Sequence, residues 1–121
     1  MRRSRTTVVL ALGAALVAAP GAGGATAPPP QKRTVTINDN FYAPAKLTVN
    51  RGSTVRWVWP EDTGDVHDVA VRARPRGEPR WASEPGAGGY TYKRVLRRPG
   101  RYAIVCTLHE EMTMTIVVRK G

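Results

Sequence analysis

The sequence predicts an all-β fold, a β-sandwich of about seven to eight short strands. Short segments alternate apolar and polar residues with a period of two, are rich in β-branched and aromatic side chains, and are separated by turn residues. No segment sustains the period of an amphipathic helix. The predicted strands are residues 34–37, 46–49, 54–59, 66–71, 90–96, 101–106 and 113–118.

Turns separate these strands in a regular way. The first two strands, 34–37 and 46–49, alternate polar and apolar residues. An Arg-Gly-Ser turn at 51–53 leads into the third strand, 54–59, and a Pro-Gly turn at 99–100 leads into the sixth strand. One face of the third strand is predicted to lie in the core; its residues are Val55, Trp57 and Trp59.

A long loop, 72–89, is predicted between the strands at 66–71 and 90–96. It carries four arginines, three prolines and four glycines, so it cannot form a continuous strand. Trp81 within it is expected to pin the loop to the body of the domain. A docking role for the loop and a merely tolerated insertion are both open.

Residues 1–25 are predicted to be a secretory signal peptide, so we expect an exported protein of the periplasm, the cell envelope or the extracellular space. Three arginines precede an apolar run at 8–19, which is about a dozen residues long and shorter than the roughly 20 residues that a membrane helix needs. Gly23 and Ala25 fit a cleavage site before Thr26. An uncleaved membrane anchor is the open alternative; after cleavage we expect no integral membrane segment.

The mature chain is predicted to consist of a proline-rich linker at 26–33 and one small domain at 34–121. Removal of the leader leaves 121 − 25 = 96 residues and lowers the net charge from 19 − 9 = +10 to 16 − 9 = +7, because three arginines leave with it. This charge favours anionic cell surfaces or acidic redox proteins as partners, rather than nucleic acid. We also expect a monomer. A purely solubilising role of the charge is equally open.

Side chains that bind soft metal ions are concentrated near the C-terminus. Beyond the initiator methionine, the chain has two histidines, one cysteine and two methionines, and four of these five residues lie within nine positions, 106–114. The fifth is His67, which opens the predicted strand 66–71. Two imidazoles, a thiolate and a thioether are the donors of a mononuclear copper site, so we predict one copper ion per chain. Zinc accepts the same donors, and the identity of the metal stays open at this point.

The predicted ligands are His67, Cys106, His109 and Met112. In the spacing Cys106-x-x-His109-x-x-Met112, a cysteine at the end of one strand and a methionine at the start of the next can direct three donors at one ion. Met112 and Met114 share a strand face, but two residues along a strand cover about 6.8 Å, so both sulfurs cannot reach the same ion. Met112 is nearer the other ligands, and Met114 is expected to fill the core. An inert buried thiol or an intermolecular disulfide at Cys106 is the alternative.

Several segments also match a known family pattern. They are Phe41-Tyr42-Ala43-Pro44, Leu47-Thr48-Val49 leading to Gly52, Val55-Arg56-Trp57, His67-Asp68-Val69, and Pro99-Gly100-Arg101-Tyr102 running to Cys106. Over nearly the whole mature chain, the sequence resembles the small cupredoxins of the plastocyanin and amicyanin type. The resemblance implies a Greek-key β-sandwich with a blue copper ion at one end, which passes single electrons between partner proteins. It also implies that the second histidine, here His109, is the surface exit for the electron.

Carboxylates near the predicted ligands raise two further hypotheses. Glu110 and Glu111 stand where many members of the family have proline or glycine. They either favour a charged imidazole on the neighbouring histidine or form an ordinary solvated turn. Asp68, beside His67, is the candidate acceptor that orients the histidine ring.

The function predicted on these grounds is that of an exported type 1 (blue) copper protein, which shuttles single electrons between redox partners through Cu(I) and Cu(II). The alternative is an extracytoplasmic copper buffer or delivery protein, which would use the same residues but exchange its metal readily. Multicopper oxidases and copper nitrite reductases need further histidines for their catalytic copper, and the predicted site uses both histidines of this chain. We therefore expect no enzyme activity.

Overall fold

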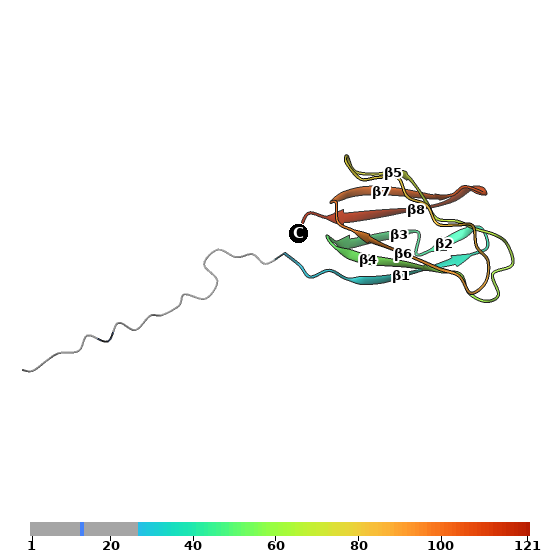
Figure 1. Ribbon diagram of the computed structural model, residues 1–121, viewed down its shortest axis with the longest axis horizontal. Helices are drawn as coiled ribbons and strands as arrows, with labels where there is room; N and C mark the ends of the chain where they lie inside the picture. Colours follow the sequence, from blue (N-terminus) through green and yellow to red (C-terminus); the bar gives the residue numbers. More distant parts are fainter. Residues whose placement is uncertain (1–12, 14–26) are drawn as a thin grey trace, which may run out of the picture.

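Eight β-strands in two sheets form the part of the chain that the structure describes, and the predicted all-β sandwich is confirmed (Figure 1). The computed structural model describes residue 13 and residues 27–121, and no helix occurs in these residues. The predicted signal peptide lies almost wholly outside them and stays a prediction. The strands are β1 (Lys32–Asn38), β2 (Phe41–Ala43), β3 (Lys46–Asn50), β4 (Ser53–Val58), β5 (Ala70–Ala73), β6 (Thr91–Leu96), β7 (Gly100–Cys106) and β8 (His109–Arg119).

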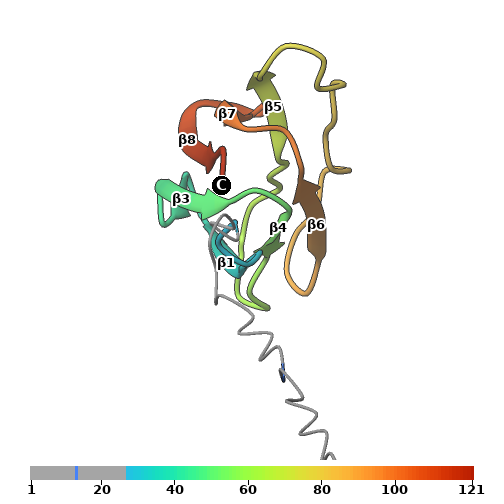
Figure 2. The same ribbon diagram turned by 90° about the vertical axis from the view of Figure 1, so that its left-hand side faces the viewer.

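The two sheets have the strand orders β2-β1-β4-β6 and β3-β8-β7-β5. Strands β1 and β4 are parallel, as are β3 and β8, and the other neighbours are antiparallel. Figure 2 shows the two layers from the end of the sandwich where the C-terminus lies. The β7–β8 hairpin lies at the opposite end, together with the β1–β2 turn (Figure 1).

The core lies between the sheets and follows the predicted alternation. The predicted core face of β4 is fully buried. In β8, Met112, Met114 and two residues beyond them point inward, whereas Thr113 is exposed and Thr115 is partly exposed. The largest fully buried side chains are Trp57, Trp59, Tyr42 and Tyr102.

The strand predicted at 66–71 is displaced, since β5 covers Ala70–Ala73. The backbone of His67 instead pairs in both directions with Gly86, at 2.9 Å for each N–O distance. Ser83 likewise donates its backbone N–H to the carbonyl of Val69, at 2.8 Å. These residues therefore bond to the following loop and not to a sheet strand, a long-range pairing that local alternation does not reveal. The short strand β2 was not predicted.

The long loop after β5 is fixed to the domain by Trp81, as the sequence predicts. Trp81 is buried and packs against Trp57, with ring centroids 5.9 Å apart. The guanidinium of Arg94 lies over the Trp81 ring, 5.1 Å from its centroid. The first two residues of the predicted loop, Arg72 and Ala73, belong to β5.

The predicted linker becomes part of the fold before its expected end. Strand β1 begins at Lys32, inside the segment predicted as linker. The side-chain amide of Asn50 donates to the carbonyl oxygen of Pro29 at 2.9 Å, and the backbone N–H of Gln31 donates to the Ser53 hydroxyl at 2.8 Å. The chain is therefore bonded to the domain from Pro29 onward. Among the described residues, no helix has the length and apolar character needed to span a membrane.

Candidate metal centre

The β7–β8 hairpin places a cysteine beside a histidine. Cys106 ends β7, His109 opens β8, and the two residues pair across the ladder with only Thr107 and Leu108 between them. The register shifts between Val105 and Cys106, an irregularity of the kind that re-aims side chains near functional sites. Cys106 is fully buried, whereas 22% of the His109 side chain is exposed. Because β8 starts at His109, this ligand lies on a strand and not in a connection between the predicted strands 101–106 and 113–118.

His67 reaches the same end of the sandwich from the connection between β4 and β5. Its backbone is fixed by the two bonds to Gly86, and the indole N–H of Trp59 donates to its carbonyl oxygen at 3.2 Å. Its side chain is fully buried. The ring of His67 is thereby placed 4.8 Å from that of His109, measured between centroids.

Three donor atoms converge in this arrangement. The Sγ of Cys106 lies 3.9 Å from Nδ1 of His67 and 3.6 Å from Nδ1 of His109. One ligand atom from each of the three residues lies within 4.8 Å of the other two. The structure thus brings together three of the four predicted ligands in one compact, mostly buried set.

Both histidine rings are oriented by carboxylates on their far nitrogens. Nε2 of His67 lies 3.0 Å from Oδ1 of Asp39, and Nε2 of His109 lies 3.1 Å from Oδ2 of Asp65. A carboxylate at Nε2 stabilises the tautomer with its proton on that nitrogen, so the Nδ1 lone pair is free to bind a metal ion. This is the protonation state that a metal-ligating imidazole requires.

Asp39 is the centre of a wider network. Besides the imidazole, its carboxylate accepts the backbone N–H of Asp65 at 3.1 Å and that of Gly64 at 3.3 Å. The hydrogen bond to His67 and then the backbone hydrogen bonds hold the pKa of Asp39 below its usual value of 3.8. One carboxylate after β1 therefore positions His67 directly and, through the loop that carries Asp65, supports the orientation of His109.

The predicted role of Asp68 is wrong, because the ring of His67 is bonded to Asp39. The Asp68 carboxylate accepts the backbone N–H of Thr107 at 2.7 Å and also the Thr107 hydroxyl. The backbone N–H of Asp68 donates to Sγ of Cys106 at 3.5 Å. Asp68 thus fastens the hairpin to the His67 segment and directs a backbone N–H at the sulfur.

Tyr42 also holds this segment in place. Its hydroxyl donates to the backbone carbonyl oxygen of Asp68 at 2.7 Å. Burial raises the pKa of Tyr42 far above its usual value of 10, so the hydroxyl stays neutral and keeps donating.

The two methionines occupy different environments, although both are buried. The indole N–H of Trp57 donates to Sδ of Met114 at 3.4 Å, deep in the core. Met112 lies two residues nearer to His109 on the same face of β8. The engagement of the Met114 sulfur supports Met112 as the fourth ligand, and this assignment remains a proposal.

The donor set fits copper. Two imidazoles with free Nδ1 atoms, a buried thiol with a backbone N–H directed at its sulfur, and a buried thioether are suited to an ion that alternates between Cu(I) and Cu(II). Sulfur donors match Cu(I), and imidazole accepts both oxidation states. His67, Cys106, His109 and Met112 together fit one copper ion per chain.

Comparisons with known proteins agree with this chemistry. A family model described as "Copper binding proteins, plastocyanin/azurin family" matches residues 31–119. A search of curated proteins found no match. Among solved structures, a reduced Cu(I) amicyanin variant is 28% identical, with a TM-score of 0.63 over 71% of this chain and 80% of that chain.

Two further structures share the fold. A pseudoazurin from Sinorhizobium meliloti is 22% identical, with a TM-score of 0.62 over 75% of this chain and 76% of that chain. A copper-containing nitrite reductase from Thermus scotoductus SA-01 is 29% identical, with a TM-score of 0.63 over 86% of this chain. The match spans only 26% of the nitrite reductase chain, so it corresponds to one part of that larger protein.

Exchange of the two methionines should separate their roles. In the copper-loaded protein, Met112→Gln should lower the reduction potential and change the visible spectrum, because an amide oxygen favours Cu(II) more than a thioether does. Met114→Leu should leave both nearly unchanged and cost about 1 kcal/mol of stability, since it keeps the core volume but removes the acceptor for Trp57. Voltammetry, absorption spectra and denaturant unfolding measure these effects. A larger spectral shift in Met114→Leu would mean that Met114 is the ligand.

Removal of the Asp39 carboxylate should weaken copper binding. We expect Asp39→Ala to lower the affinity by about 10- to 100-fold, the usual effect of losing a carboxylate that orients a ligating histidine. Asp39→Asn, which keeps one acceptor oxygen, should lower the affinity for copper by a smaller factor. Competition with a Cu(I) chelator measures the affinity, and Asp62→Ala is the control, because Asp62 is an exposed carboxylate of the nearby connection between β4 and β5. Equal affinities of Asp39→Ala and Asp62→Ala would contradict the positioning role.

Proposed function

The chain belongs to the plastocyanin/azurin family of copper-binding proteins, and on this basis we propose that it is an exported blue copper protein that carries single electrons between redox partners. The observation that carries the proposal is the close approach of Cys106 Sγ to the two Nδ1 atoms, with both Nε2 atoms already bonded to carboxylates. Bound copper supplies the one-electron step by alternating between Cu(I) and Cu(II). Export depends on the predicted signal peptide.

The protein's own residues support such a step by holding the donors fixed. Cys106 and His67 are excluded from water, and their backbones are bonded to different parts of the sandwich. A donor set held in this way need not rearrange when the charge of the site changes by one unit. Low rearrangement is the property that an electron carrier needs.

His109 is the proposed exit for the electron. It is the one donor of the set whose side chain is partly exposed. Two exposed apolar residues adjoin members of the site in the sequence: Leu108, 52% exposed, precedes His109, and Val66, 43% exposed, precedes His67. A small apolar contact surface around a partly exposed donor suits brief docking with a redox protein.

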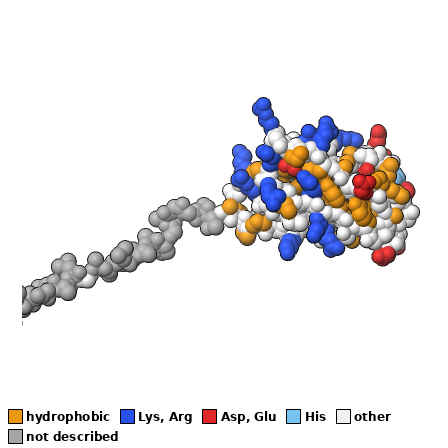
Figure 3. Space-filling view, in the orientation of Figure 1, with side chains coloured by type: hydrophobic (Ala, Val, Ile, Leu, Met, Phe, Trp, Pro, Cys, Tyr) orange, Lys and Arg blue, Asp and Glu red, His pale blue; other side chains and the backbone are white. Residues whose placement is uncertain are grey.

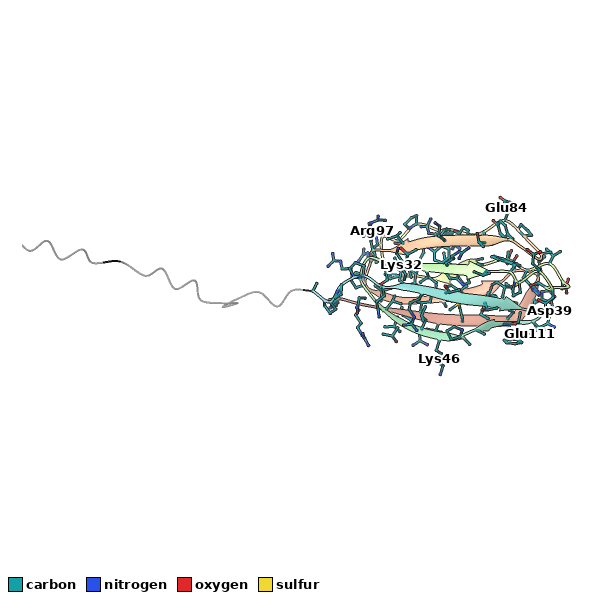
Figure 4. All side chains as sticks on the ribbon, turned by 90° about the horizontal axis from the view of Figure 1, so that it is seen from below. Lys32, Asp39, Lys46, Glu84, Arg97 and Glu111 are labelled. Atoms are coloured by element: carbon teal, nitrogen blue, oxygen red, sulfur yellow. The ribbon has the colours of Figure 1, made fainter. Side chains whose placement is uncertain are left out.

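Charge is unevenly distributed along the molecule. The exposed carboxylates lie after β1, between β4 and β5, in the loop before β6, and at the start of β8; they are Asp39, Glu61, Asp62, Asp65, Glu84, Glu110 and Glu111. Figure 4 places its labelled Asp39, Glu84 and Glu111 at one end, and Lys32 and Arg97 toward the other. Figure 3 shows most lysines and arginines away from the histidine end. Acidic partners stay a prediction from net charge, whereas the local charge favours a redox partner with basic groups around His109.

A copper buffer or delivery protein remains the second candidate, favoured by the partial exposure of His109, through which copper could be handed over. A multicopper oxidase or a copper nitrite reductase would need further histidines for its catalytic copper, and both histidines are already in the proposed site. We therefore propose no catalytic activity for this chain, and we propose that it acts as a monomer.

Copper loading tests the proposal directly. Addition of Cu(II) to the purified protein should produce an intense thiolate-to-copper absorption band in the visible region, and the band should be absent in Cys106→Ser, which keeps the shape but not the thiolate. The reduced protein should exchange electrons reversibly at an electrode and lose copper to a chelator only slowly. A colourless copper complex would contradict the blue copper assignment, and rapid loss of copper without reversible electron exchange would favour the buffer or delivery role.

Because of the uneven charge, a change in ionic strength should alter the rate of electron transfer in the direction opposite to that expected from the net charge. The reduced protein should react faster with a cationic cobalt(III) oxidant as salt is lowered, because Glu110 and Glu111 lie beside His109. Oxidation by anionic hexacyanoferrate(III) should show the reverse dependence. Glu110→Gln/Glu111→Gln should weaken both trends, whereas the control Arg97→Gln/Arg101→Gln should keep them. Faster reaction with hexacyanoferrate(III) at low salt would show that the net charge of the whole protein governs docking.

A further inference from the structure

A groove lined by basic side chains lies on the outward face of the sheet β2-β1-β4-β6. Its volume is about 540 Å³, and it crosses β1, β4 and the start of β6. Its lining contains four cations and three threonines but no carboxylate and no aromatic side chain. We call it the basic groove; its residues are Lys32, Arg33, Thr34, Thr54, Arg56, Thr91 and Lys93.

The strand register concentrates like charges in this groove. Arg56 on β4 lies directly opposite Lys93 on β6, and Thr34 on β1 lies on the other side of Arg56. Like charges at directly opposed positions of neighbouring strands destabilise a sheet. The fold therefore maintains a repulsion that a bound anion would relieve.

No carboxylate of the protein neutralises these cations. Within residues 27–121, the ion pairs join His67 to Asp39, His109 to Asp65, and two arginines to Glu78. None of them includes a cation of the basic groove. All nine acidic residues of the sequence lie in the described part, and none lines the groove.

The spacing of the cations suits a chain of negative groups. Opposed residues on neighbouring strands such as Arg56 and Lys93 are about 5 Å apart at Cβ. Lys32, which is paired with Thr54, lies one strand away from Arg56 and two residues along, roughly 8 Å in the same geometry. The charges thus recur across the sheet at intervals of about 5 to 8 Å.

We propose that the basic groove binds a linear polymer that carries a phosphate group in each repeating unit, such as a polyol phosphate. Arginine and lysine bind phosphate oxygens with charge-assisted hydrogen bonds, and the three threonine hydroxyls supply further donors along the groove. The absence of aromatic side chains from the lining disfavours single-stranded nucleic acid, whose bases stack on such rings. The absence of exposed apolar side chains from it disfavours insertion into a lipid bilayer.

A polymer in this position would hold the protein without blocking the metal centre. Lys32 lies toward the end of the sandwich opposite Asp39 and Glu111 (Figure 4). The carboxylates around His109 repel the same polymer, so the histidine end should point away from it. Such binding would retain and orient the protein on a phosphate-bearing surface, a role separate from electron transfer.

The test is a titration of the copper-loaded protein with a synthetic glycerol-phosphate polymer at low ionic strength, in which calorimetry measures the binding. We expect binding that falls steeply with salt, and we expect Arg56→Gln/Lys93→Gln to weaken it by about tenfold or more. The matched control is Arg97→Gln/Arg101→Gln, which removes the same charge from exposed positions outside the groove. The visible spectrum of each variant reports that the domain and its metal site are intact.

Three results would overturn the proposal. They are no binding of the polymer, an equal loss of affinity in the groove variant and in the control, and binding of a thymidine oligonucleotide or of phosphatidylglycerol vesicles as tight as that of the polymer. An equal loss would mean that total charge alone attracts the polymer, and tight binding of the oligonucleotide or the vesicles would assign the groove to a different partner. The titration does not depend on electron transfer, so it can refute polymer binding by the groove without refuting the proposed electron-transfer function, and the reverse also holds.

Discussion

The site depends above all on the pairing of Cys106 with His109 across a connection of two residues. This hairpin fixes a buried sulfur beside a partly exposed imidazole at one end of the sandwich, and Asp68 fastens it to the segment that carries His67. Because His67 is bonded to the following loop through Gly86, three separate parts of the chain must pack correctly before the donors meet. The metal centre is thus a product of the whole sandwich.

Carboxylates outside the donor set orient the two histidines of the site. Asp39 and Asp65 bond the far nitrogens of the two histidines and so direct the free nitrogens at the sulfur. The same carboxylates, with Glu110 and Glu111, make the histidine end acidic in a protein whose net charge is positive. Under the proposed function, carboxylates that orient the ligands would therefore also help to select the redox partner.

Period-two alternation was sufficient to predict the sandwich and most of its strands, because the buried residues of β4 and β8 recur at every second position. The spacing of Cys106, His109 and Met112 likewise predicted which end of β8 holds the site. The role of Asp39 could not be predicted, since it lies 28 residues before His67 and resembles an ordinary turn residue. Adjacency to His67 in the sequence favours Asp68 for this role, but neighbouring side chains on an extended segment point in opposite directions. Contacts that depend on how loops fold back are invisible to local patterns.

A crystal structure of the copper-loaded protein would show whether the fold prepares a site of two imidazoles, a thiolate and a thioether. We expect one copper ion bound by Nδ1 of His67, Nδ1 of His109 and Sγ of Cys106, with Sδ of Met112 as a longer fourth contact and with Asp39 and Asp65 still bonded to Nε2. Copper bound through the Asp39 or Asp65 oxygens, or through the sulfur of Met114, would contradict this expectation.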